Sequence, residues 1–94
     1  MTGEVLDAAC YLAHGRKGAG PGHRRCADEC INKKNFPIGL LTEDGTTYLL
    51  VPDHADEAPY EQLKEHASDT VTVEGQKVER GGLPGLIVQS VTKK

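Results

Sequence analysis

The sequence predicts a small, mainly β domain of five strands with two short helices. Short runs rich in Val, Leu, Ile and Thr recur along the 94 residues, and eleven glycines and five prolines provide turns between them. Helical spacing of apolar residues is confined to two segments. A chain of this length supports one modest core, so residues 1–94 are expected to form a single domain.

The first strand is expected over residues 2–9 (TGEVLDAA), with Cys10 at its end. A Cys- and His-rich loop-helix insertion follows over residues 10–35. Its second half, from 23 to about 34, is predicted to be a helix that starts after a Gly- and Pro-rich loop, and Pro37 lies beyond its end.

Two strands are expected next, over residues 38–42 (IGLLT) and 47–51 (TYLLV). The four residues between them contain Asp44-Gly45, which is a strong signal for a tight hairpin. These strands should therefore be adjacent and antiparallel.

The second helix is predicted over residues 60–67, with Asp56 as a plausible N-cap and Pro59 in the first turn. Its apolar positions repeat at i, i+3 and i+7 and should face the core. They are Tyr60, Leu63 and Ala67.

The last two strands are predicted over residues 69–79 and 86–91, with a glycine-rich turn over 80–85. Gly75 interrupts the first of them and indicates a bulge or bend. The element order then matches an OB-like, five-stranded Greek-key barrel. In it the Cys/His insertion lies between strands 1 and 2, and a helix lies between strands 3 and 4. A different small barrel, such as an SH3-like one, is the alternative.

Cysteines and histidines cluster in one stretch of 21 residues. The spacing within this stretch is CxxxH, eight intervening residues and then HxxCxxxC. The candidate metal ligands are Cys10, His14, His23, Cys26 and Cys30. On a helix, positions i, i+3 and i+7 lie within roughly 60° of arc, so the last three share one face. The glycine-rich loop can return the first two to that face.

This pattern predicts a metal site. Two thiolates with two imidazoles, or three thiolates with one imidazole, form a tetrahedral zinc site. Sites that mix thiolate and imidazole ligands also accept copper or iron. Zinc is the first choice, in a structural role, whereas copper or iron would indicate a carrier or redox role. Two alternatives remain: the cysteines are a buried helix face, or two of them form a disulfide.

Charge is distributed unevenly along the chain. The formal net charge is −3, yet residues 14–35 contain six basic and two acidic residues, which gives a local charge of +4. An OB module that contacts nucleic acid or a protein through this basic insertion is therefore the alternative function. Nucleic acid is the less favoured partner, because the net charge is negative and aromatic residues for base stacking are few. A thiol enzyme based on Cys26 and His23 is a third hypothesis, and a non-enzymatic role is favoured over it.

The segments CYLAHGRKG, HRRCADEC and GLLTEDGTTYLLVPDH resemble those of a set of small, largely uncharacterised bacterial domains. The resemblance extends from Gly3 to Val91 and implies no established activity. It implies that the five candidate ligands act as a unit. No apolar run approaches the roughly 18 residues of a membrane span, and no signal peptide is evident. A soluble protein is expected, in the cytoplasm or as an exported domain without its leader.

Overall fold

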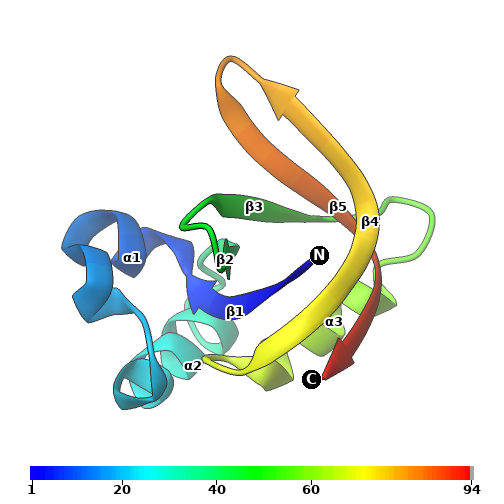
Figure 1. Cartoon of the computed structure of the whole chain (residues 1–94). Helices are drawn as coiled ribbons and strands as arrows, with labels where there is room; N and C mark the ends of the chain where they lie inside the picture. The colour runs from blue at the N-terminus through cyan, green and yellow to red at the C-terminus, as the bar shows by residue number, and fades with distance from the viewer. Residues whose placement is uncertain (94) are drawn as a thin grey trace.

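The computed structural model describes residues 1–93 and shows a mainly β protein with three short α-helices (Figure 1). The strands are β1 (Thr2–Asp7), β2 (Ile38–Thr42), β3 (Thr47–Pro52), β4 (Thr70–Arg80) and β5 (Leu83–Lys93). The helices are α1 (Ala8–His14), α2 (Arg24–Asn32) and α3 (Ala58–Leu63). Short 3-10 turns occupy Gly15–Gly18, Pro21–His23 and Lys64–His66.

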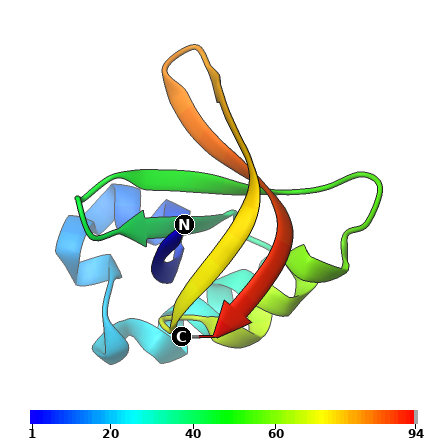
Figure 2. The same ribbon diagram turned by 45° about the vertical axis from the view of Figure 1, so that its right-hand side comes forward.

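The five strands close into a barrel in the order β1-β2-β3-β5-β4. β1 pairs antiparallel with both β2 and β4, β2 pairs antiparallel with β3, and β4 pairs antiparallel with β5. The pairing of β3 with β5 is parallel. The far half of the β4–β5 hairpin projects from the barrel as an arm (Figure 2). Within the described residues, no helix is long and apolar enough to cross a bilayer.

Local turn and bulge signals are confirmed. Gly39 pairs with Leu49 in the predicted hairpin, and Asp44 Oδ1 accepts a hydrogen bond from Thr46 N at 3.0 Å in its turn. The register of β4 shifts at Gly75, where a Cβ would overlap the backbone of the neighbouring strand. β4 is shifted by one residue from its predicted range, whereas β5 starts three residues earlier and ends two residues later than predicted. The turn between them is therefore Gly81-Gly82, and the predicted turn over residues 80–85 is wrong.

The first strand ends earlier than predicted. It stops at Asp7, and an unpredicted helix, α1, begins at Ala8, so the expected strand through Ala9 with Cys10 at its end is wrong. The Asp7 side chain caps the helix, because its Oδ1 accepts from Ala9 N at 3.0 Å and Cys10 N at 3.3 Å. α1 ends at His14, and its C-cap residue, Gly15, has a φ of 62°, which lies in the region that favours glycine.

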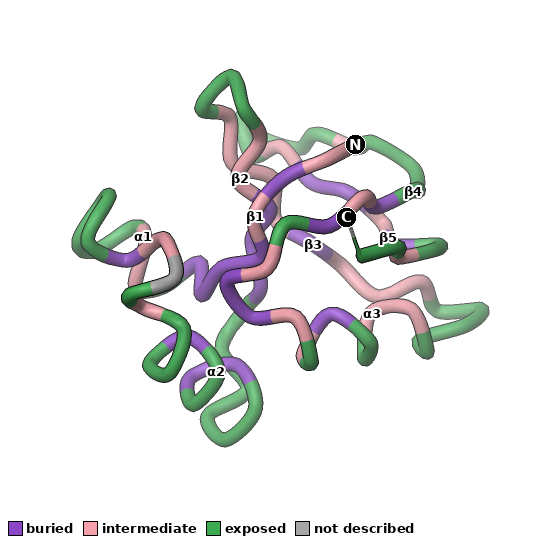
Figure 3. Tube along the Cα trace, turned by 60° about the horizontal axis from the view of Figure 1, so that its bottom comes forward, coloured by how far each residue is buried: buried purple, intermediate pink, exposed green. Residues whose placement is uncertain are grey.

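The core lies inside the barrel and beneath α2 and α3. Buried apolar side chains line the inner faces of the strands, and the buried segments follow the strands in Figure 3. α2 adds Ala27 and Ile31, and the predicted stripe of the second helix is confirmed, since Leu63 and Ala67 are buried. The helical part of that segment is shorter than predicted and ends in a 3-10 turn. α2 is thus anchored to the barrel through one face.

Candidate metal centre

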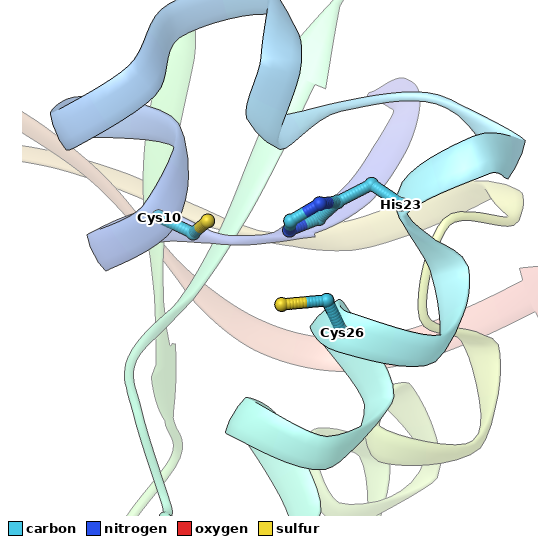
Figure 4. Close-up of side chains that lie close together, drawn as sticks. All are labelled: Cys10, His23 and Cys26. Carbon is cyan, nitrogen blue, oxygen red and sulfur yellow. The ribbon is translucent and has the colours of Figure 1, made fainter.

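Three of the five candidate ligands meet at one point. Cys10 comes from α1, His23 from the turn before α2, and Cys26 from the first turn of α2, and their side chains point toward one another (Figure 4). One ligand atom of each lies within 4.8 Å of the others. A zinc ion holds tetrahedral S and N ligands about 3.5–4 Å apart. A small inward movement of the side chains would therefore bring these three ligand atoms to the spacing of a tetrahedral site.

The loop between the two helices is held close to α1 and β1. At Gly18 a Cβ would lie 2.9 Å from the backbone of Cys10, so only glycine allows this approach. Gly20 N donates to Glu4 Oε2 at 2.6 Å, which ties the loop to β1. The chain therefore returns to α1 before α2 begins, which places the second half of the motif opposite the first.

α2 is fixed at both ends to the segment that follows α3. At its start, Arg24 Nη1 donates to Asp69 Oδ1 at 2.6 Å and to Ala67 O at 3.1 Å. At its end, Asn32 Nδ2 donates to Lys64 O at 2.8 Å. With this orientation fixed, His23 and Cys26 face α1.

His23 has a buried ring nitrogen without a partner. Its Nε2 is inaccessible and has no hydrogen-bond partner among the described residues. Buried polar atoms are nearly always paired, since leaving one unpaired costs about 1–3 kcal/mol. An imidazole nitrogen that would otherwise be unsatisfied can be satisfied by a metal ion.

Cys10 in the cluster and Cys30 outside it both have raised thiol pKa values. Burial raises the pKa of Cys10, and the charges of Cys26 and Asp7 raise it further. Burial raises the pKa of Cys30 to about 11, with Asp7 and then Cys26 adding to the effect and Lys34 opposing it. These two thiols hold their protons at neutral pH, so a metal that coordinates either one must displace a proton.

The remaining two candidate ligands lie outside this group. His14 is exposed at the C-terminal end of α1, although it follows Cys10 by four residues on the same helix. Cys30 is buried one turn beyond Cys26, with its thiol near Asp7. All three cysteines are free thiols, so the disulfide alternative has no support in this structure.

Sequence reasoning missed Asp7. Its side chain is 0% exposed, its Oδ1 caps α1, and its Oδ2 is buried without a hydrogen-bond partner among the described residues. Because residues 2–9 were expected to be one strand, this carboxylate had no assigned role. The available signal was an aspartate directly before a run of helix-forming residues (AACYLA), which is a typical N-cap pattern.

The basic charge of the insertion is partly neutralised by an ion pair between Arg24 and Asp69. Arg24 is engaged by Asp69, and His66 Nδ1 lies 3.2 Å from the other oxygen of that carboxylate. This pairing weakens the alternative hypothesis that the insertion binds nucleic acid, because Arg24, one of its basic residues, already has an acidic partner.

Replacing Asp69 with asparagine should flatten the acid dependence of stability. The hydrogen bond from Arg24 is the main cause that lowers the pKa of Asp69 below its usual value of 3.8. Its stabilising effect is therefore complete above about pH 4 and is lost as the pH falls through the folded-state pKa. We expect Asp69→Asn to lower the free energy of unfolding by about 1 kcal/mol near neutral pH. In acid the unfolding free energy of the wild type should fall toward that of the variant.

Urea unfolding followed by circular dichroism, from about pH 7 to pH 3, measures this effect. Glu65→Gln is the matched control, since Glu65 is an exposed carboxylate on the preceding turn with no ion pair in the described part of the chain. If the plots of unfolding free energy against pH were parallel for wild type and Asp69→Asn, the ion pair would contribute nothing to folding.

Comparison with protein-family models, with curated proteins and with solved structures finds no match for the chain. The functional conclusion therefore depends on the geometry of the Cys10, His23 and Cys26 cluster.

Proposed function

We propose that the chain binds a transition-metal ion through Cys10, His23 and Cys26, with zinc as the first choice and copper or iron as alternatives. The observation that supports this most is the convergence of three soft ligand atoms within 4.8 Å from two separate helices. The unpartnered Nε2 of His23 adds support, because a buried imidazole without a hydrogen bond is costly unless something binds it.

The three residues form a Cys2His set with a fourth position to be filled. Cys26 is exposed, so water or another exogenous ligand can approach the ion from its side. If Cys30 or His14 rotated its side chain into the fourth position, the result would be the closed structural site that the sequence pattern predicts. In either case the ion would link α1 to α2 and stabilise the insertion, since binding energy adds to folding energy.

We also propose that the barrel is of the OB type. Three features support this assignment: the closed strand order, the pairing of β1 with both β2 and β4, and a helix between β3 and β4. In such a barrel the loop between the first two strands borders the usual ligand face. The proposed metal site would then lie beside that face.

Cobalt(II) titration tests the metal assignment. Tetrahedral coordination by two thiolates should produce intense thiolate-to-metal absorption in the near ultraviolet and visible bands that saturate at one equivalent, and zinc should abolish both. A pale, octahedral spectrum without thiolate bands would contradict the proposal. The His54→Ala variant, altered at an exposed turn, should titrate like the wild type.

A further inference from the structure

The outer half of β4 has one edge without a partner strand. β5 pairs with β4 over residues 71–80, whereas β1 covers the other edge of β4 only over residues 70–72, with two further hydrogen bonds between Met1 and Val73. Within residues 1–93, no strand lies against the second edge of residues 74–80. We call this segment the arm edge, and it projects from the barrel (Figure 2). Unpaired backbone groups along such an edge are a template for pairing with another chain.

Two opposite charges on the arm edge lie on the same face of β4. Lys77 and Glu79 are exposed and two residues apart, so their side chains leave the strand on one side. Lys77 Nζ lies 5.5 Å from the centroid of the Tyr48 ring, so this is the face that turns toward β3. Among the ion pairs of the described residues, none includes Lys77 or Glu79. Both charges are therefore available to a second chain.

These charges favour one register of pairing with a second copy of the chain. Two identical edge strands related by a two-fold axis pair antiparallel, and one residue lies opposite its own copy. With Val78 at that position, Lys77 lies opposite the second copy's Glu79, and Glu79 lies opposite its Lys77. Opposite charges directly across a strand pair are stabilising. A register centred on Lys77 or on Glu79 would instead place like charges opposite each other, which is destabilising.

The space beside the arm edge suits the register centred on Val78. A hollow of about 270 Å³ borders Met1, Glu74 and Gly75 at the base of the arm. In this register the second copy's turn, Gly81-Gly82, reaches the positions opposite Gly75 and Glu74. A turn without side chains can enter this hollow without displacing the residues that line it.

We propose that the protein forms a two-fold homodimer through the arm edge, with the two β4 strands paired antiparallel about Val78. The two arms then form one four-stranded antiparallel sheet. The inference is independent of the proposed metal site, because it uses none of the residues of that cluster. The contact is shorter than a standard interface of about 1,600 Å², so the association should be weak and concentration-dependent.

Sedimentation velocity from about 10 µM to about 1 mM protein, under reducing conditions, measures this association. Lys77→Glu should raise the dissociation constant of the dimer about tenfold or more, because two attractive pairs become repulsive. Glu79→Lys should have the same effect for the same reason. An equimolar mixture of these two variants should associate as the wild type does, because one copy then presents two acidic residues to two basic residues of the other.

Two charge reversals on the same strand are the matched controls. Arg80→Glu makes the same charge change as Lys77→Glu, and Glu74→Lys makes the same change as Glu79→Lys. In the proposed register these positions lie opposite Gln76 and Gly82, which carry no charge. Both controls should therefore associate like the wild type. Far-ultraviolet circular dichroism establishes that every variant is folded.

A wild type that stays monomeric at about 1 mM would overturn the inference. A dimer that Lys77→Glu and Glu79→Lys leave unchanged, or that their mixture fails to restore, would also overturn it, because another surface would then hold the copies together. An equal loss of association in both controls would mean a general effect of charge and would count against the register. None of these results bears on metal binding, which the cobalt titration tests separately.

Discussion

Replacement of Cys26 by serine is expected to lower zinc affinity at least about 100-fold, beyond the 10- to 100-fold loss that follows removal of groups that only support a ligand. Cys26 supplies one of two thiolates in the proposed set, and a serine hydroxyl is a poor zinc ligand at neutral pH. Because Cys26 is exposed, the variant should fold. Chelator competition on wild type and variant measures the change.

Two histidines outside the cluster supply controls for this prediction. His54→Ala and His66→Ala should retain wild-type zinc affinity, since neither side chain belongs to the group that converges on Cys26. Equal zinc affinity in Cys26→Ser and in both histidine variants would contradict the assignment. Substitution of His14 or Cys30 then shows whether either one fills the fourth position.

Truncation of Ile31 to alanine is expected to cost about 2–4 kcal/mol of unfolding free energy. Ile31 is 0% exposed and belongs to the main core cluster, where it anchors α2 to the barrel. Removing its side chain leaves a cavity beneath the helix that presents His23 and Cys26. Zinc binding should weaken as well, because part of the binding free energy must then reorder α2.

Urea denaturation of the metal-free proteins measures this loss. Leu12→Ala is a matched control, since Leu12 is also a helical aliphatic residue but is 82% exposed. Its unfolding free energy should stay within about 0.5 kcal/mol of the wild type. Similar values for both variants would mean that α2 is not anchored through Ile31.

The parts of the fold that follow from local chemistry were predictable. The Asp44-Gly45 turn, the bulge at Gly75 and the buried stripe through Leu63 each depend on a few neighbouring residues, and the structure confirms all three. α1 was missed because the segment before it continues an apparent strand without a break. The decisive contact is the cap by Asp7, which a short helix needs and which strand periodicity conceals.

The candidate site was likewise predictable only where its geometry depends on local spacing along the chain. Helical spacing predicted one shared face for His23, Cys26 and Cys30, and the glycine-rich loop predicted the return of Cys10 and His14 to it. The structure brings Cys10, His23 and Cys26 together, whereas His14 and Cys30 lie outside that group. The exposure of His14 could not be foreseen, because it depends on α1, a helix absent from the prediction. The burial of Asp7 beside the thiols depends on tertiary packing, which no local pattern reports.

The decisive test of the metal centre is metal analysis of freshly purified, untagged protein by mass spectrometry, combined with a free-thiol count after chelation and unfolding. We expect close to one zinc ion per chain and all three cysteines as free thiols. A protein without metal after zinc supplementation, and with two thiols missing, would contain a disulfide and would contradict the metal centre.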